Sequence, residues 1–555
     1  MPPRGKKRRH WPWVLAVFIM MAVAIGLGIR HVIKRAEPIL RTRVIETLSA
    51  RFKSKVELAE LHVSVSHGLG VDGKGLKIFG LTDPNPTAPG VQPLLSIDEF
   101  SFGTGVRSLF RSPIHVATVY VKGMTMNLPP KEDRGQLNDM RGPQDEDEQT
   151  GKTKKNRISI IVDEFVCENT QLIINTHKPG KEPLDFQISH LKMKDLGPGQ
   201  AMPFDATLVN PKPVGDIQST GHFGPLHEEE PRDTPVDGEY SFTNADLGTL
   251  KGIAGILSST GKYQGSLGRI EVNGKTDTPD FRIAISGHPV PLHTEFHAIV
   301  DGTDGDTYLQ PVSAHFLHTW FTAKGKVVRV KGHGHDIELD VVMNRARIED
   351  LLQLGVKTDP PVMSGDVTMQ TKMSLPPGQQ EVAQKLKLDG HFKIINGQFS
   401  NDKIQDRIDS LSLRSQGKPK MAQEHVDVNV PSELNGTFTL DQGLFNFSVL
   451  HFNIPGTDAD ITGQYSLDGN TFDFHGKLKM DAKLSQMTTG WKSLLLKPVD
   501  HFFKKDGAGT EIPFKVSGTK SEPHFGLDLH HKDGDDKENG KDAEPKPNPD
   551  SARTE

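Results

Sequence analysis

Two stretches of the chain hold residue types that could do chemistry of different kinds. The acidic run DGTDGD (301–306) offers oxygen ligands of the kind that calcium prefers, and Cys167 is a possible nucleophile. Glycines interrupt the alternating ligand spacing of a calcium loop, and no suitably placed Glu follows. Asp-Gly pairs between alternating runs are typical of hairpin turns. We therefore expect a turn at 301–306 rather than a metal site, and a packed thiol at Cys167 with no activating base nearby.

Histidines form a third group of candidate ligands. His333 and His335 lie in KGHGHD, and His315 and His318 lie in HFLHTW. Residues two apart share one face of a strand, so His333 and His335 could chelate a metal, but the sequence offers no evident third ligand. Solvated histidines on strands are the favoured interpretation.

The familiar catalytic motifs are missing from the sequence. It contains no G-x-S-x-G, no H-E-x-x-H and no phosphate-binding loop. The glycines of HGLGVDGKGLKIFG do not precede a helix, as dinucleotide binding would require. Carboxylates are scattered, which leaves a carbohydrate-active β-protein as a minor alternative. We expect no enzyme, no cofactor and no catalytic or metal-ligating residue.

Short strands are the elements that would have to position any site. In the stretch 440–480, apolar residues alternate with polar ones, as in Phe445, Phe447, Phe472 and Phe474. Val449 continues the phase of Phe445 and Phe447, and Leu450 begins the opposite phase, so the alternation changes phase between Val449 and Leu450. One inserted residue swaps the faces of a strand, so this phase change predicts a β-bulge and a bend. Which of the two phases faces inward stays open.

Composition favours a thin, one-sided architecture. The apolar fraction is 35%, below the roughly 45–50% of an ordinary soluble domain. The 54 glycines and 38 prolines favour many short strands over long helices, and a single cysteine excludes an intramolecular disulfide. The net charge of −5 gives no reason to expect a nucleic-acid partner. The fold class expected is mostly β, with two arrangements left open: a two-sheet sandwich, or a curled sheet whose apolar lining is covered by acyl chains.

The N-terminus predicts a membrane anchor. Five basic residues between Arg4 and Arg9 precede the uncharged, mostly apolar run 11–29. Nineteen helical residues would span about 28 Å, close to the hydrocarbon thickness of a bilayer. The small residues Ala22 and Ala24 suit a cleaved signal peptide, but the apolar run continues beyond them. We expect an uncleaved anchor with a cytoplasmic N-terminus.

The rest of the chain divides by composition into strand-rich regions and charged segments. After the anchor, 36–51 has the spacing of a short helix, and short helical patterns also follow strand-like runs at 244–253, 344–356 and 481–491. The segments 129–157 and 530–555 are rich in charge and poor in apolar residues, so we expect them to be disordered. The expected organisation is a cytoplasmic basic segment 1–10, an anchor 11–29, an N-terminal β region 30–128, a disordered loop 129–157, a central β region 158–330, a C-terminal β region 331–529 and a disordered tail 530–555.

Several of these segments together resemble AsmA family proteins. The resemblance rests on the basic start, the single span, LSARFKSKVELAELHVSVSHGLGVDGKGLKIFG and SLFRSPIHVATVYVKGMTMNLP near the N-terminus, PDFRIAISGHPVPLHTEFHAIVDGTDGDTYLQPV in the middle, and 390–480 near the C-terminus. It extends over about 11–529. It implies a bacterial protein anchored in the inner membrane, with its body in the periplasm. It also implies an elongated, curled antiparallel β-sheet that forms an open hydrophobic groove, with a few short helices.

The function expected from the resemblance is phospholipid transport between the two membranes and maintenance of the outer membrane. Phospholipids and the inner membrane are the expected partners, together with outer-membrane or periplasmic proteins. A periplasmic scaffold or assembly factor for outer-membrane proteins, which pairs clients with an exposed strand edge, is the alternative. The residues expected to line the groove are Val63, Val65, Phe445, Phe447, Phe472, Phe474, Leu478 and Met480.

Overall fold

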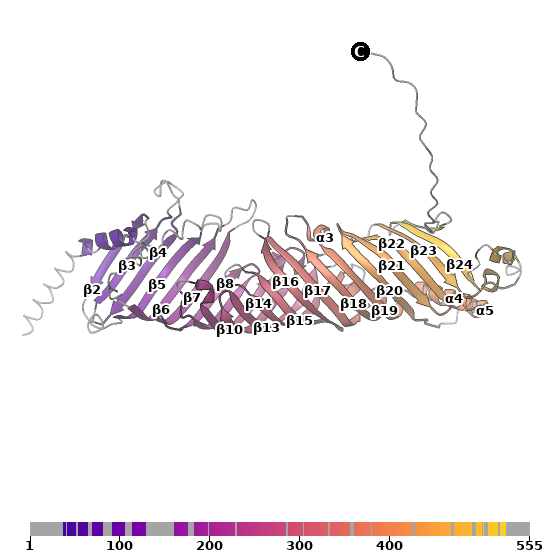
Figure 1. Ribbon diagram of the computed structural model, residues 1–555, viewed down its shortest axis with the longest axis horizontal. Helices are drawn as coiled ribbons and strands as arrows, with labels where there is room; N and C mark the ends of the chain where they lie inside the picture. Colours follow the sequence, from indigo (N-terminus) through magenta and orange to yellow (C-terminus); the bar gives the residue numbers. More distant parts are fainter. Residues whose placement is uncertain are drawn as a thin grey trace, which may run out of the picture.

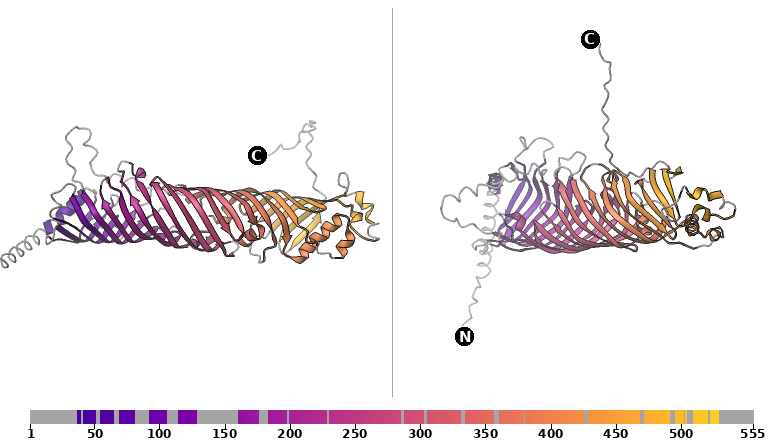
Figure 2. Two further views of the ribbon diagram at one scale, coloured as in Figure 1. Left: turned by 90° about the horizontal axis from the view of Figure 1, so that it is seen from below. Right: turned by 45° about the vertical axis from the view of Figure 1, so that its right-hand side comes forward.

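The computed structural model shows one elongated β-sheet with short helices along it (Figures 1 and 2). It describes residues 37–528 with internal gaps, of which the longest are 81–91, 106–113 and 129–159. The expected anchor 11–29, loop 129–157 and tail 530–555 lie outside the described residues. None of the helices within the described ranges is long and apolar enough to cross a membrane.

All the described strands belong to a single sheet of 25 strands. They are β1 (Val56–Glu57), β2 (Glu60–Ser64), β3 (Leu69–Ile78), β4 (Leu95–Thr104), β5 (Ile114–Leu128), β6 (Ile160–Ile174), β7 (Leu184–Leu196), β8 (Met202–Pro211), β9 (Val214–Phe223), β10 (Pro235–Asp246), β11 (Ile253–Ala254), β12 (Ile256–Ser266), β13 (Arg269–Ile283), β14 (Val290–Val300), β15 (Thr307–Phe316), β16 (Thr319–Val330), β17 (Gly334–Arg347), β18 (Met363–Leu375), β19 (Lys387–Phe399), β20 (Ser432–Asp441), β21 (Leu444–Ile454), β22 (Thr457–Ser466), β23 (Thr471–Met480), β24 (Thr510–Thr519) and β25 (Pro523–Leu527).

The helices are short. They are η4 (Pro231–Asp233), η5 (Leu247–Thr249), α2 (Ile348–Gly355), α3 (Val382–Lys385), α4 (Asp402–Ser415), α5 (Pro419–Gln423), η6 (Leu484–Gln486) and η7 (Val499–His501). Residues 37–39 and 41–50 are also helical, as expected for 36–51. The three short helical patterns that follow strand-like runs are confirmed, because η5 follows β10, α2 follows β17 and η6 follows β23.

Strands pair almost entirely with their neighbours in the chain, and the pairing is antiparallel except between β5 and β6. A parallel pair needs a long return connection, since β6 must start at the same end of the sheet as β5. A strand of 15 residues is roughly 50 Å long. The residues 129–159 between the two strands are numerous enough to cover that distance. β1 and β2 share one side of β3, and β11 and β12 share one side of β13, so at about 4.8 Å per rank of strands the whole sheet is roughly 105 Å long.

The sheet is open rather than closed into a ring. β1 and β2 pair with β3 at one end, and β25 pairs with β24 at the other. The helical segment before β1 covers part of the first edge: Arg41 donates from Nε to the carbonyl of Leu58 at 2.7 Å, and the N–H of Val63 donates to Glu37 Oε1 at 3.4 Å. An edge strand whose N–H groups are partly satisfied is less prone to pair with another chain.

The expectation of a mostly β, antiparallel fold with few short helices is confirmed. Since every described strand belongs to the one sheet, the two-sheet sandwich is not the arrangement that these residues adopt. The small buried clusters lie where helices meet the ends of strands. One gathers Met343, Met363 and Ile394 beneath Leu351 of α2, and another gathers Met480 and Met487 beside Leu411 of α4.

Candidate functional site

One face of the sheet is apolar along almost its whole length. Residues that pair across neighbouring strands share a face, so the register shows which side chains lie side by side. One unbroken row of such partners, the apolar row, crosses from β2 to β24 and contains no charged residue. Its members are Val63, Val71, Phe102, Val119, Phe165, Met193, Phe204, Gly221, Gly238, Tyr263, Val272, Ala298, Leu309, Gly325, Leu339, Met373, Leu388, Leu440, Phe445, Tyr465, Phe472 and Gly518.

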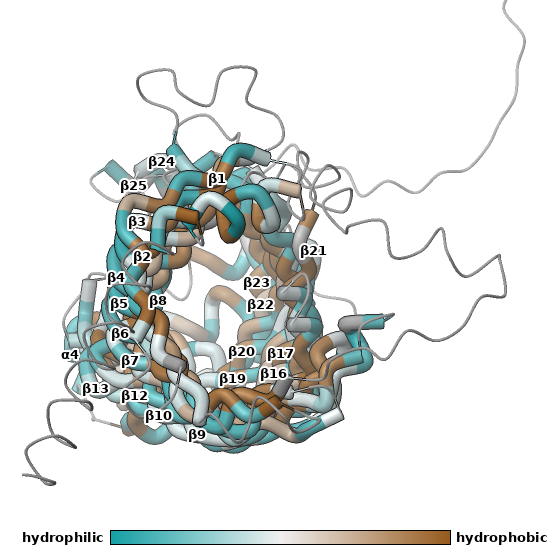
Figure 3. Tube along the Cα trace, turned by 90° about the vertical axis from the view of Figure 1, so that its left-hand side faces the viewer, coloured by the Kyte–Doolittle hydropathy of each residue, from teal (hydrophilic) through white to brown (hydrophobic). Residues whose placement is uncertain are grey.

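The face that carries this row, which we name the apolar face, is not covered like a protein core. Most large side chains of the apolar row are half-buried, among them Val63, Phe102, Phe445 and Phe472. No second sheet of the described residues packs on either face, since the described strands form one sheet. Figure 3 shows hydrophobic positions in strands from both ends of the molecule. Exposed, contiguous apolar surface of this extent is unusual and commonly marks a binding site.

A β-bulge in β21 unites the two phases of its apolar pattern. Phe447 pairs with Gly463 of β22, whereas Leu450 pairs with Ile461. Gly463 and Ile461 are two residues apart and therefore share a face, so Phe447 and Leu450 share it too. The predicted bulge is confirmed, and Phe447 and Leu450 both face the apolar side. Val449 was expected to share the face of Phe447, but it pairs with Thr437 and faces the polar side, because the bulge begins before it.

Phenylalanines form a chain across the C-terminal part of this face. Ring centroids are 6.1 Å apart between Phe392 and Phe438, and 6.0 Å apart between Phe438 and Phe445, Phe445 and Phe447, and Phe447 and Phe474. These separations are typical of attractive aromatic pairs. The chain crosses β19, β20, β21 and β23 and thus gives a continuous aromatic surface. Phe392 and Phe438 were not among the residues predicted to line a groove, although both lie in alternating runs that could have identified them.

The predicted lining residues do not all have the same surroundings. Phe474 and Leu478 are half-buried, like Phe445, Phe447, Phe472 and Val63. Met480 is only 1% exposed, because it packs in the small core beside α4 and η6. Val65 lies outside the described residues.

The opposite face, the polar face, carries cross-strand ion pairs. Lys262 Nζ lies 2.6 Å from Glu239 Oε1, and Lys275 Nζ lies 2.6 Å from Glu295 Oε1. The hydrogen bond from Lys275 lowers the pKa of the Glu295 carboxyl. Oppositely charged partners directly across a strand pair stabilise the pairing, while the exposure of these groups keeps each contribution small.

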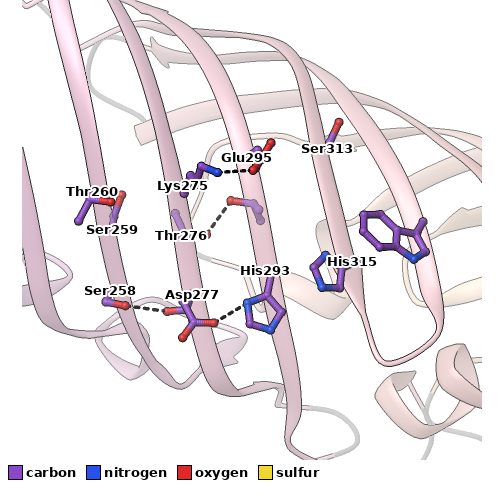
Figure 4. A pocket seen from close by; sticks show the side chains of 12 residues that line it. Ser258, Ser259, Thr260, Lys275, Thr276, Asp277, His293, Glu295, Ser313 and His315 are labelled. Carbon is purple, nitrogen blue, oxygen red and sulfur yellow. Dashed lines mark hydrogen bonds and ion pairs between the residues drawn. The ribbon is translucent and has the colours of Figure 1, made fainter.

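A shallow cavity of about 640 Å³ lies on the polar face over β12 to β16 (Figure 4). Nδ1 of His293 lies 2.5 Å from Asp277 Oδ1 at this cavity. The ring of His315 stacks between His293 and Trp320, at centroid distances of 4.7 and 4.3 Å. His293 and His315 thus each contact side chains of neighbouring strands.

The structure also places the other two candidates from the sequence, the acidic run 301–306 and Cys167. The described part of the chain holds no group of three or more His, Cys, Asp or Glu residues placed to bind a metal. The stretch 301–306 joins the antiparallel strands β14 and β15, as expected of a turn. Cys167 is fully buried on the apolar face, with its Sγ 2.6 Å from Thr170 Oγ1, and burial raises the pKa of its thiol. A buried, protonated thiol of this kind is unreactive.

His318, His333 and His335 are the other histidine candidates, and His335 lies exposed on β17 opposite Arg329 of β16. The ring of His318 lies 3.4 Å from the carboxylate of buried Asp350, which also accepts a hydrogen bond from the hydroxyl of Thr319. His333 lies outside the described residues.

The chain was also compared with known proteins. No family model matches it, and no similar curated protein or solved structure was found.

Proposed function

We propose that the protein is a conduit that binds the acyl chains of phospholipids along its apolar face. The unbroken apolar row from Val63 to Gly518, without a second sheet among the described residues to cover it, is the observation that supports this proposal. Such a face needs a nonaqueous partner. An acyl chain suits a long, narrow surface better than a compact ligand would.

Movement along the face requires no chemistry. Each methylene group removed from water contributes about 0.8 kcal/mol, whichever part of the row it contacts. Neighbouring positions of a uniform lining therefore bind a chain with similar free energy, so the steps between them cost little. This agrees with a face that offers phenylalanine, leucine, valine and glycine rather than reactive groups.

In this proposal the sheet curls into a trough with the apolar face inside. Register shifts recur in many strand pairs, for example between Phe242 and Ala245 of β10 and between Phe447 and Leu450 of β21. A β-bulge bends its strand and increases the local twist. Bends repeated from strand to strand would turn a flat ribbon into a trough, which shields the lipid tails from water.

The resemblance to AsmA proteins, together with the predicted span at 11–29, suggests where the conduit works. We place the N-terminus in the cytoplasm of a two-membrane bacterium, the anchor in the inner membrane and the sheet in the periplasm. There the protein would move phospholipid between the membranes and so maintain the outer membrane.

Photo-crosslinking in cells tests the proposal on the full chain. A photoreactive phenylalanine analogue at Phe447 or Phe474 faces the apolar side, whereas the same analogue at neighbouring Asn446 or Asp473 faces the polar side. We expect phospholipid adducts, identified by mass spectrometry, only at Phe447 and Phe474. Equal adduct yields at the four positions, or none at all, would contradict an apolar conduit.

A scaffold that pairs clients along a strand edge is the second candidate. The supporting observation is β25, which pairs on one side with β24 and has no second partner strand in the described ranges. Phe447→Asp separates the two functions, since a charge in the lining should block lipid binding and leave edge pairing unchanged. Asn446→Asp is the matched control on the polar face. Circular dichroism of both variants establishes that the fold is retained.

A further inference from the structure

Six hydroxyl side chains interrupt the apolar face near the middle of the sheet. They form what we name the hydroxyl cluster: Ser219, Tyr240, Ser259, Tyr263, Thr276 and Thr294. They come from β9, β10, β12, β13 and β14. Sequence alternation alone gives no reason to group them, because they are spread over 76 positions of the chain.

The register places all six on the apolar face. Tyr263 belongs to the apolar row, and Ser219 pairs with Tyr240 in the next row of partners. Ser259 pairs with Thr276, and Thr276 pairs with Thr294. These three lie two residues along their strands from Gly261, Gly274 and Phe296, which continue the row of Tyr240. The cluster is therefore a compact polar patch inside an apolar surface.

Glycines lie beneath the aromatic rings of the patch. A Cβ added at Gly238 would come within 2.6 Å of Tyr263 Oη, and one added at Gly261 within 2.7 Å of a ring carbon of Tyr240. The rings therefore lie over the backbone of neighbouring strands rather than standing away from the sheet. Burial raises the pKa of both phenols, so both are protonated at neutral pH.

The six hydroxyls form three pairs with each other. The oxygen–oxygen distances are 2.8 Å for Tyr263 and Ser219, 3.1 Å for Tyr240 and Ser259, and 2.6 Å for Thr276 and Thr294. Ser219 also donates to the carbonyl of Glu239 at 2.9 Å, so the Tyr263 phenol must be the donor to Ser219.

The number of hydroxyl protons shows that the Tyr240–Ser259 pair and the Thr276–Thr294 pair can each donate one further hydrogen bond. Each hydroxyl carries one proton, and one proton suffices to join a pair. One O–H of the Tyr240–Ser259 pair and one of the Thr276–Thr294 pair therefore remain available to donate. An O–H group that is covered by a hydrocarbon chain and has no acceptor costs free energy. A purely aliphatic ligand would therefore bind better to apolar side chains at these positions.

We propose that the hydroxyl cluster binds the ester carbonyls of a diacyl lipid in the conduit. This inference rests on the proposed function and deepens it by defining the lipid class. The two available O–H groups match the two ester carbonyls of a diacyl lipid, which are acceptors without protons. The surrounding phenylalanines and valines contact the acyl chains on either side. The patch thus forms a resting position part-way along the apolar face, specific for ester-linked lipids.

Ester and ether lipids with equal chains test the inference. The probes are dipalmitoyl phosphatidylglycerol, a diester, and the dihexadecyl analogue, a diether without carbonyl groups. Native mass spectrometry of the detergent-solubilised full chain measures how much of each is bound at equal concentration. Because two neutral hydrogen bonds are at stake, we expect a preference of about 5- to 150-fold for the diester.

Variants establish whether the cluster causes the preference. Tyr240→Phe combined with Ser259→Ala, Thr276→Val and Thr294→Val nearly keeps the side-chain shapes and removes the hydroxyls of both pairs. We expect it to bind diester and diether equally, with diether binding as in the unaltered chain, which also shows that the variant is folded. The matched control changes Tyr308→Phe, Ser258→Ala, Thr260→Val and Thr322→Val on the polar face, and should keep the preference.

Two results would overturn the inference in different ways. If the unaltered chain binds both lipids equally well, the conduit stands and the carbonyl site does not. If the unaltered chain binds neither lipid, the conduit itself is wrong, and the carbonyl site with it.

Discussion

Phe447 and Leu450 point to the same face of β21 although they are three positions apart in the chain. In a regular strand, residues three apart point to opposite faces. The bulge at 448–449 removes this conflict, because two residues of β21 there take the place of one on the neighbouring strand. The bulge therefore makes one apolar surface from two runs of opposite phase.

Single-residue deletions in β21 should have opposite effects on stability. Deleting Ser448 removes the bulge and leaves Phe447 and Leu450 two apart, so both still face the apolar side. Deleting Asn446 moves a phenylalanine to the polar face, whichever way the strand adjusts. We expect the second deletion to lower the free energy of unfolding by about 1.5–3 kcal/mol more than the first, measured by urea denaturation. Equal losses would contradict the assigned register.

Gly274 should tolerate no side chain, because it lies under two aromatic residues. A Cβ there would come within 2.7 Å of both Phe296 Cζ and Tyr240 Oη. Gly274→Ala should therefore lift the rings and cost about 1–3 kcal/mol of unfolding free energy. Gly105→Ala, with no atom within 4 Å of the added carbon, is the control and should be nearly neutral in the same denaturation experiment.

Asp409 of α4 should be important for the helical end of the sheet. Its carboxylate is buried and accepts hydrogen bonds from the backbone N–H groups of Val428, Asn429 and Val430 at 2.9–3.2 Å. Asp409→Ala leaves these donors without their acceptor and should cost about 2–4 kcal/mol. Hydrogen exchange measures the effect locally, and exchange at 428–430 should accelerate most. Asp402→Ala, at the exposed start of α4, is the control.

Acid should weaken the pairing of β22 with β21 and β23. Asp460 accepts a hydrogen bond from Lys479 Nζ at 2.7 Å and lies 2.5 Å from His451 Nδ1; the bond from Lys479, then that from His451, lowers its pKa below the ordinary 3.8. A lowered pKa contributes stability above the ordinary value, and this is lost as the pH falls through the lowered one. We expect a small loss of stability below about pH 4 that Asp460→Asn abolishes, measured by urea midpoints from pH 2.5 to 7.

Much of the fold could be predicted because its signals are local. Alternation in 440–480 predicted the one-sided strands there, and the phase change between Val449 and Leu450 predicted the bulge. That Phe445, Phe447, Phe472 and Phe474 share one face could be predicted for the same reason. Strand alternation reports which side chains share a face, and this holds whatever the partner strands are.

What the sequence by itself determined is a long series of one-sided strands with little chemistry. Only the tertiary structure decided that they form one sheet, because alternation is equally compatible with a sandwich. Register is also non-local, so the apolar row from Val63 to Gly518 and the meeting of Tyr240 with Ser259 follow from strand pairing alone. Met480 shows the same limit, since its alternation matches that of Phe474 and only the packing of α4 and η6 buries it.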